Sequence, residues 1–121
     1  MKAPAPKRLY LLLGDSFLAE SKISEIIREC SGSSARAEHR TYHASDWDPA
    51  AFAEEARTYP FLAGCKILVL KEGHALREAA VEKLTRLLPK IPDFTTVILQ
   101  ADALRKEDAI YAWAREYGTV M

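Results

Sequence analysis

A chain of 121 residues, 49% hydrophobic and 28% charged, is long enough to bury one hydrophobic core and too apolar to be disordered. Its 17 basic and 17 acidic residues cancel, which argues against binding to nucleic acid or an anionic membrane through net charge. The two cysteines lack metal-ligand spacing, and no apolar run approaches the roughly 18 residues needed to span a bilayer. We therefore expect a cytoplasmic protein with no metal site and no membrane partner.

The N-terminal region predicts a loose leader followed by a strand and a helix. Residues 1–8 carry lysines and prolines but no apolar signal-peptide core, so we expect a flexible leader before a single α/β domain at residues 9–121. Leu9–Leu13 predicts a buried strand that ends at Gly14. Asp15 or Ser16 can cap the helix that follows. Its inner face is expected to comprise Ile23, Ile26, Ile27 and Cys30.

The middle of the chain predicts a second strand and a second helix. Residues 38–43 alternate in polarity, which favours a strand. Asp48 and Pro49 form a typical helix start, with a capping carboxylate and proline at the first helical position. Pro60 ends this helix, because the residue before a proline is disfavoured in helical conformation. The inner face is expected to comprise Phe52, Ala53 and Ala56.

The last part of the chain repeats this unit. Strands are predicted at Lys66–Leu70 and Thr95–Leu99, with a third helix between them that ends at Pro89. The inner face of that helix is expected to comprise Leu76, Ala80, Leu84 and Leu87. A fourth helix, with its apolar face between residues 109 and 117, leads to a fifth strand at Thr119–Met121. Because the chain stops just inside this strand, we expect the N-terminal fragment of a longer protein.

Alternation of short strands with helices predicts an α/β fold. We expect a doubly wound, mostly parallel five-stranded sheet with helices on both faces. Such sheets bind ligands at the carboxyl ends of their strands, so the segment after the first strand is the place to look for a phosphate-binding loop.

That segment departs from a working phosphate loop. After Gly14, the position of the second glycine holds Ala19, and the lysine position holds Glu20; only Ser21 agrees with the pattern. A carboxylate there would repel a triphosphate. We therefore predict a degenerate phosphate loop, no cofactor and no catalytic residues.

The segment before the third strand is the main candidate for a contact with another molecule. Pro60 places Phe61 and Leu62 on a connection, and exposed apolar side chains on a loop can serve a protein partner. The alternative is that Phe61 tucks under its own loop as part of the core. Two roles are also possible for Trp47: it either packs before the second helix or forms another exposed contact.

Three stretches of the sequence carry a resemblance to a known family. They are Leu9–Asp15, Ala56–Leu62 with the apolar strand that follows, and Pro92–Leu99 with residues 103–106 shortly after. In this order and spacing, the chain resembles the N-terminal domain of the delta subunit of the bacterial DNA polymerase III clamp loader. The resemblance covers nearly all of the chain from Leu9.

The resemblance implies a fold like that of AAA+ P-loop ATPases without a working ATP site. It implies a non-catalytic subunit of the polymerase III holoenzyme, a nucleotidyltransferase complex, that grips the sliding clamp (the beta subunit) and helps to open it during DNA replication. The clamp-binding residues would be Pro60 and Phe61 with Leu62 adjacent, although proline stands where some members have leucine. Partners would be the clamp, other clamp-loader subunits and, through the full complex, DNA. The alternatives are a divergent nucleotide-binding α/β enzyme and a free-standing interaction scaffold.

Overall fold

The computed structural model describes residues 9–31, 37–58, 65–87, 90–92, 94–102, 111–112, 115 and 119–120. Strands and helices alternate in the order β1 (Leu9–Leu13), α1 (Ser16–Ser31), β2 (Ala37–His43), α2 (Pro49–Arg57), β3 (Cys65–Lys71), α3 (Glu78–Leu87), β4 (Thr95–Ala101) and β5 (Thr119–Val120). Two short 3-10 turns, η1 (Ala44–Asp46) and η2 (Gly73–Ala75), follow β2 and β3. The predicted alternation of strands and helices is confirmed.

The strands form one parallel sheet in the order β2-β3-β4-β1-β5. Strands β1 to β4 have five to seven residues each and make up most of the sheet. The fifth strand is only two residues long and pairs with Tyr10 and Leu11 at the edge of β1. The expected five-stranded sheet is therefore four full strands with a short addition. Because every pairing is parallel, all carboxyl ends lie at the same edge of the sheet.

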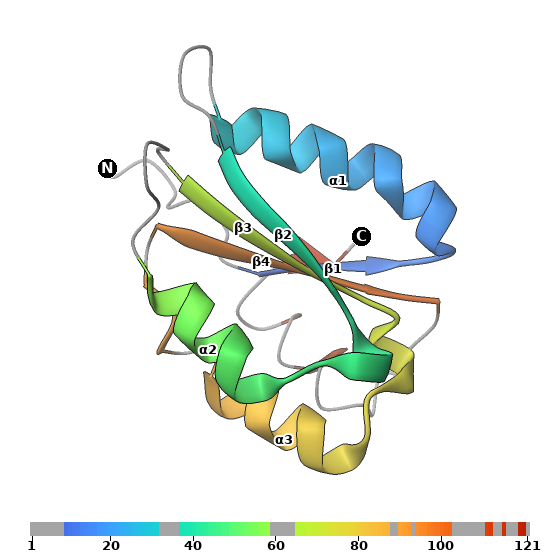
Figure 1. The fold of residues 1–121 in the computed structure, drawn as a ribbon. Helices are drawn as coiled ribbons and strands as arrows, with labels where there is room; N and C mark the ends of the chain where they lie inside the picture. The colour runs from blue at the N-terminus through green and yellow to red at the C-terminus, as the bar shows by residue number, and fades with distance from the viewer. Residues whose placement is uncertain are drawn as a thin grey trace.

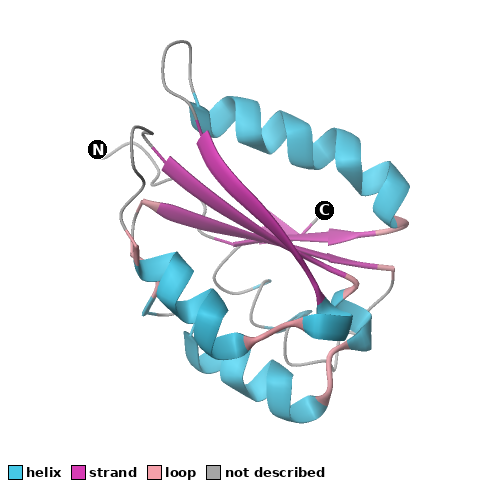
Figure 2. Ribbon diagram, in the orientation of Figure 1, coloured by secondary structure: helices cyan, strands magenta, loops and turns pink. Residues whose placement is uncertain are grey.

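Helices cover both faces of this sheet (Figures 1 and 2): α1 lies over one face, and α2 and α3 lie over the other. The core layer formed by α1 and one face of the sheet comprises Leu12, Ala19, Ile23, Ile26, Ile67, Val69 and Ile98. The layer formed by α2, α3 and the other face comprises Leu9, Leu11, Phe52, Ala56, Leu68, Leu70, Leu84, Ile91, Val97 and Leu99. Successive residues of the central strands thus enter opposite layers, which is why residues 67–70 of β3 and 97–99 of β4 are apolar without interruption. Within the described residues, no helix is both long and apolar enough to cross a membrane.

Helix boundaries follow the predicted caps with two refinements. Asp48 accepts hydrogen bonds from the backbone N–H groups of residues 50 and 51, and Pro49 begins α2 as expected. Asp15, rather than Ser16, provides the cap of α1, since Ser16 is already its first residue.

The prediction that Leu76 belongs to the third helix is wrong: α3 begins at Glu78, because the η2 turn intervenes. Most of the fourth helix predicted around residues 109–117 lies outside the described residues.

The carboxyl end of α2 is fixed by side chains from the sheet. Lys66 on β3 is 1% exposed, and its ammonium donates to the carbonyl oxygens of Glu55 at 3.0 Å and Thr58 at 2.6 Å. The same ammonium lies 3.2 Å from the Glu55 carboxylate. Thr95 on β4 donates its hydroxyl to the carbonyl of Ala56 at 2.8 Å. A helix end leaves its last carbonyls without intrahelical partners, and here the strands supply them.

An aromatic cluster supports the start of α2. The ring centroid of buried Phe52 lies 5.1 Å from that of Tyr42 and 5.4 Å from that of Trp47, both in edge-to-face geometry. Burial, and secondarily the Glu55 carboxylate, raises the pKa of the Tyr42 hydroxyl. The Trp47 indole nitrogen is buried without a hydrogen-bond partner among the described residues. Trp47 therefore packs before the second helix, the first of the two roles expected for it.

The buried ammonium makes a sharp prediction for stability. Lys66→Met keeps the aliphatic stem but leaves the carbonyls of Glu55 and Thr58 without this donor, so we expect a loss of about 2–4 kcal/mol in the free energy of unfolding. Urea denaturation monitored by circular dichroism measures this loss. The matched control is Lys90→Met, which removes an exposed ammonium and should change stability by no more than about 0.5 kcal/mol. Equal stabilities of the two variants would contradict the role assigned to Lys66.

Candidate functional site

The β1–α1 connection lies at the carboxyl edge of the sheet, and the backbone N–H groups of Gly14 and Phe17 are already engaged there. Gly14 has a φ of 138°, which a residue with a Cβ adopts only with strain. Its N–H donates to the carbonyl of Ala101 at 2.9 Å. The Asp15 carboxylate accepts the N–H of Phe17 at 2.7 Å. A carboxylate of the chain itself therefore occupies the positive end of α1, where a phosphate-binding helix would receive its anion.

The charges on the next turn of α1 are reversed relative to a phosphate site. Glu20, at the position of the phosphate-binding lysine, forms an ion pair with Lys71 at the carboxyl end of β3. In phosphate-loop enzymes the loop provides a lysine, and an aspartate helps to hold magnesium. Ala19, where the pattern has its second glycine, is 7% exposed and packs from α1 into the core. Ser21 is exposed. The structure thus pairs Glu20 with Lys71 and buries Ala19 between α1 and the sheet.

Gln100 ties together the loops that follow β1 and β3. Its side chain is fully buried; its oxygen accepts the N–H of Glu72 at 2.9 Å, and its nitrogen donates to the carbonyl of Gly14 at 2.7 Å. The same nitrogen lies 3.3 Å from the Asp102 carboxylate. Glu72 has a φ of 62°, a left-handed conformation that costs a non-glycine residue about 1 kcal/mol or more. One amide therefore fixes a strained loop and the β1–α1 loop to β4.

The histidines at this edge contact neighbouring loops. Nδ1 of His74 accepts the backbone N–H of Asp102 at 3.1 Å, and Nε2 lies 3.9 Å from the carboxylate of the same residue. His43 lies 3.6 Å from the Glu72 carboxylate. Over the described residues, no group of three histidine, cysteine, aspartate or glutamate side chains is arranged to hold a metal ion. These polar groups bind one another and the backbone.

Sequence reasoning missed an exposed apolar pair beside the degenerate loop. Phe17 is 82% exposed and Leu18 is 71% exposed, both in the first turn of α1. Ala19, Ile23 and Ile26 carry the helical stripe that packs on the sheet. The signal was present in the sequence, since neither Phe17 nor Leu18 falls on that stripe at helical spacing.

The predicted clamp-binding residues Pro60, Phe61 and Leu62 lie outside the described residues. What the structure describes is the chain on either side of residues 59–64. On the N-terminal side, the last turn of α2 and Thr58 are held by Lys66 and by side-chain hydrogen bonds to the helix carbonyls. On the C-terminal side, β3 pairs with both β2 and β4 from its first residues. The candidate contact segment therefore connects two fixed elements.

Comparison with known proteins places the chain beside replication proteins. A family model described as the delta subunit of DNA polymerase III matches residues 10–116. The fold is similar to that of the Bacillus subtilis DNA clamp loader delta protein YqeN, at 16% identity and a TM-score of 0.69, over 94% of this chain and 37% of that one. It is also similar to a DNA polymerase III gamma subunit-related protein from Thermotoga maritima, at 10% identity and a TM-score of 0.65, over 97% of this chain and 41% of that one. No curated protein sequence matches.

The Gln100 amide should be required for order at the carboxyl edge. Gln100→Leu removes the hydrogen bonds to Glu72 and Gly14 and leaves two part-buried backbone groups without this partner, so we expect a loss of about 1–3 kcal/mol in unfolding free energy. Hydrogen exchange of the Glu72 amide should accelerate more than exchange of amides in the middle of β3. Wild-type exchange at Glu72 in a folded Gln100→Leu variant would show that the amide does not hold this loop.

Proposed function

Because this chain belongs to the family of DNA polymerase III delta subunits, we propose that it is a clamp-loader domain that binds the sliding clamp and helps to open it for loading onto DNA. The observation that carries this proposal is the family match over residues 10–116. The similar fold of a protein described as a clamp loader delta protein supports it. The clamp, other clamp-loader subunits and, through the complex, DNA are the proposed partners. Since the chain spans 37% of that similar protein, this function is proposed for the domain as part of such an assembly.

The contact with the clamp is assigned to Pro60, Phe61 and Leu62. An aromatic side chain that fills an apolar pocket at the centre of an interface contributes about 2–4 kcal/mol when it is a hot spot. Support for this site comes from its two ends, where Lys66 fixes the last turn of α2 and β3 pairs on both sides. A short segment between fixed ends loses less conformational entropy on binding than a free tail, which favours affinity.

Ring opening follows from differential affinity. A bound domain shifts the clamp toward an open state only if it contacts that state more favourably than the closed one. The domain would therefore act by binding rather than by catalysis, and the side chains of Phe61 and Leu62 would make the contact with the clamp. ATP would act through other subunits of the loader, which would control when this segment is presented to the clamp.

A non-catalytic role is supported by the charges of the degenerate loop. Asp15 caps α1, and Glu20, which forms an ion pair with Lys71, stands where a phosphate loop has its lysine. Each carboxylate would add electrostatic repulsion at the helix end that must attract the phosphates. We therefore propose that the domain shares the architecture of AAA+ ATPases but does not bind or hydrolyse ATP.

The first test of this function compares two phenylalanines. Phe61→Ala should weaken binding to a purified sliding clamp by about 30-fold or more, as expected for loss of an aromatic hot spot, with little change in the melting temperature. Surface plasmon resonance against the immobilised clamp measures the affinity. The matched control is Phe17→Ala, because Phe17 is also apolar and is 82% exposed on α1; this variant should bind the clamp as the unaltered chain does. If Phe61→Ala instead lowered the melting temperature by many degrees, Phe61 would belong to the core.

The second test separates this function from a divergent nucleotide-binding enzyme. Isothermal titration of the chain with ATP and magnesium should give no saturable heat at micromolar to millimolar concentrations, because Asp15 and Glu20 oppose the phosphates. A Glu20→Gln variant serves as the comparison, since it removes one charge without adding a cation. Saturable micromolar binding by the unaltered chain would favour the enzyme and count against a domain without its own ATP site.

A further inference from the structure

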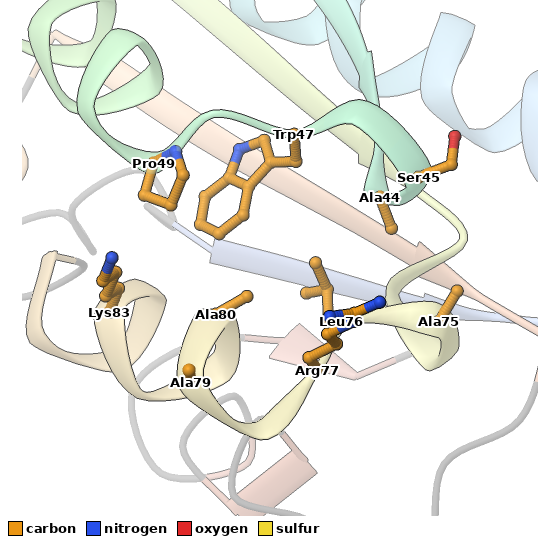
Figure 3. A pocket seen from close by; sticks show the side chains of 10 residues that line it. All are labelled: Ala44, Ser45, Trp47, Pro49, Ala75, Leu76, Arg77, Ala79, Ala80 and Lys83. Carbon is orange, nitrogen blue, oxygen red and sulfur yellow. The ribbon is translucent and has the colours of Figure 1, made fainter.

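A groove lies between the turn that leads into α2 and the turn that leads into α3. Figure 3 shows Trp47 and Pro49 on one side of it, facing Leu76 and Ala80 on the other. Its volume is about 570 Å³. Because η1 follows β2 and η2 follows β3, the groove is at the carboxyl edge of the sheet. The β1–α1 connection lies at the same edge, but β4 separates β1 from β2 and β3 in the strand order.

The apolar walls of this groove are anchored in the core. Trp47 contacts the buried ring of Phe52 edge-to-face, with the two ring centroids 5.4 Å apart. Leu76 packs against the same core layer from the opposite side. Since both walls rest on buried residues of one cluster, the groove does not have to form when a ligand arrives. A preformed site loses less entropy on binding than one assembled from mobile side chains.

The charged residues of the groove are both cationic. Arg77 stands just before α3 and Lys83 stands on it, both are exposed, and neither forms an ion pair with any residue that the structure describes. The described residues that line the groove include no carboxylate. Six residues of helix rise by about 9 Å, which is close to the length of three residues in an extended peptide. The spacing of the two cations therefore suits a strand-like segment with two acidic side chains.

We propose that this groove is a docking site for an acidic, apolar peptide segment of a partner protein. An apolar side chain of the peptide lies between Trp47 and Leu76, and its carboxylates pair with Arg77 and Lys83. The apolar lining favours a peptide over a nucleic acid backbone, and the balanced charge of the chain provides no broad field for phosphates. The site is separate from the proposed clamp contact, because residues 59–64 precede β3 in the chain and the groove follows the carboxyl ends of β2 and β3.

The test begins with selection of a random decapeptide library, displayed on phage, against the folded chain. We expect the enriched peptides to combine aspartate or glutamate with leucine, phenylalanine or tryptophan. Fluorescein-labelled synthetic copies should bind saturably in fluorescence anisotropy and change the tryptophan emission of the chain. Two variants should weaken this binding at least about tenfold: Ala80→Glu, which fills the groove with a carboxylate, and the double variant Arg77→Glu/Lys83→Glu. The control, Lys90→Glu, reverses one lysine charge outside the groove and should bind normally.

The melting temperature of each variant shows whether it is folded under the conditions of the binding assay. If a charge-reversed variant melts early, Arg77→Gln/Lys83→Gln replaces it, because glutamine removes the cations without adding repulsion. Enrichment of no acidic, apolar peptide would overturn the proposal. So would binding that Ala80→Glu and the charge variants leave unchanged. Displacement of the peptides by a single-stranded oligonucleotide, with the same sensitivity to Arg77 and Lys83, would assign the groove to nucleic acid instead. Because the Phe61→Ala variant should bind these peptides normally, failure here is distinguishable from failure of the clamp proposal.

Discussion

The contact of the buried Lys66 ammonium with the carboxyl end of α2 is the interaction that joins this helix to the sheet. A lysine on a central strand would ordinarily be costly to bury, because its charge loses the solvation of water. Here the cost is offset by the carbonyls of Glu55 and Thr58 and by the Glu55 carboxylate. Thr95 completes the arrangement from the neighbouring strand. The sheet thus determines where α2 ends.

The opposite edge of the sheet is organised by a second set of internal contacts. In a nucleotide-binding domain, the ligand and its metal would neutralise and order the loops after the strands. In this chain the Gln100 amide links two of those loops to β4, and Glu20 and Lys71 neutralise each other. The chain's own side chains therefore provide the order that a phosphate would otherwise bring.

Particular residues show how far the sequence could be interpreted. Leu9–Leu13 was predicted with the observed bounds, and Asp48 with Pro49 gave the start of α2, because both signals are local. Leu76 was assigned to a helix because its spacing suits the stripe of α3, yet the η2 turn places it before that helix. The Glu20–Lys71 pair joins residues 51 positions apart, and Gln100 reaches Gly14 across 86 positions. No local pattern indicates such pairs, since their partners meet only once the strands have taken their order in the sheet.

The sequence by itself determined the alternation of strands and helices, the two-sided burial of the central strands and the loss of the phosphate-loop residues. These features depend on hydrophobic periodicity, capping chemistry and residue identity, which act over a few neighbouring positions. Only the tertiary structure decided that Lys66 is a buried cap rather than a solvated strand end, and that Trp47 and Leu76 enclose a groove flanked by two cations. The physical reason is that burial and charge pairing depend on the packing of distant segments, which the order of the parallel strands sets.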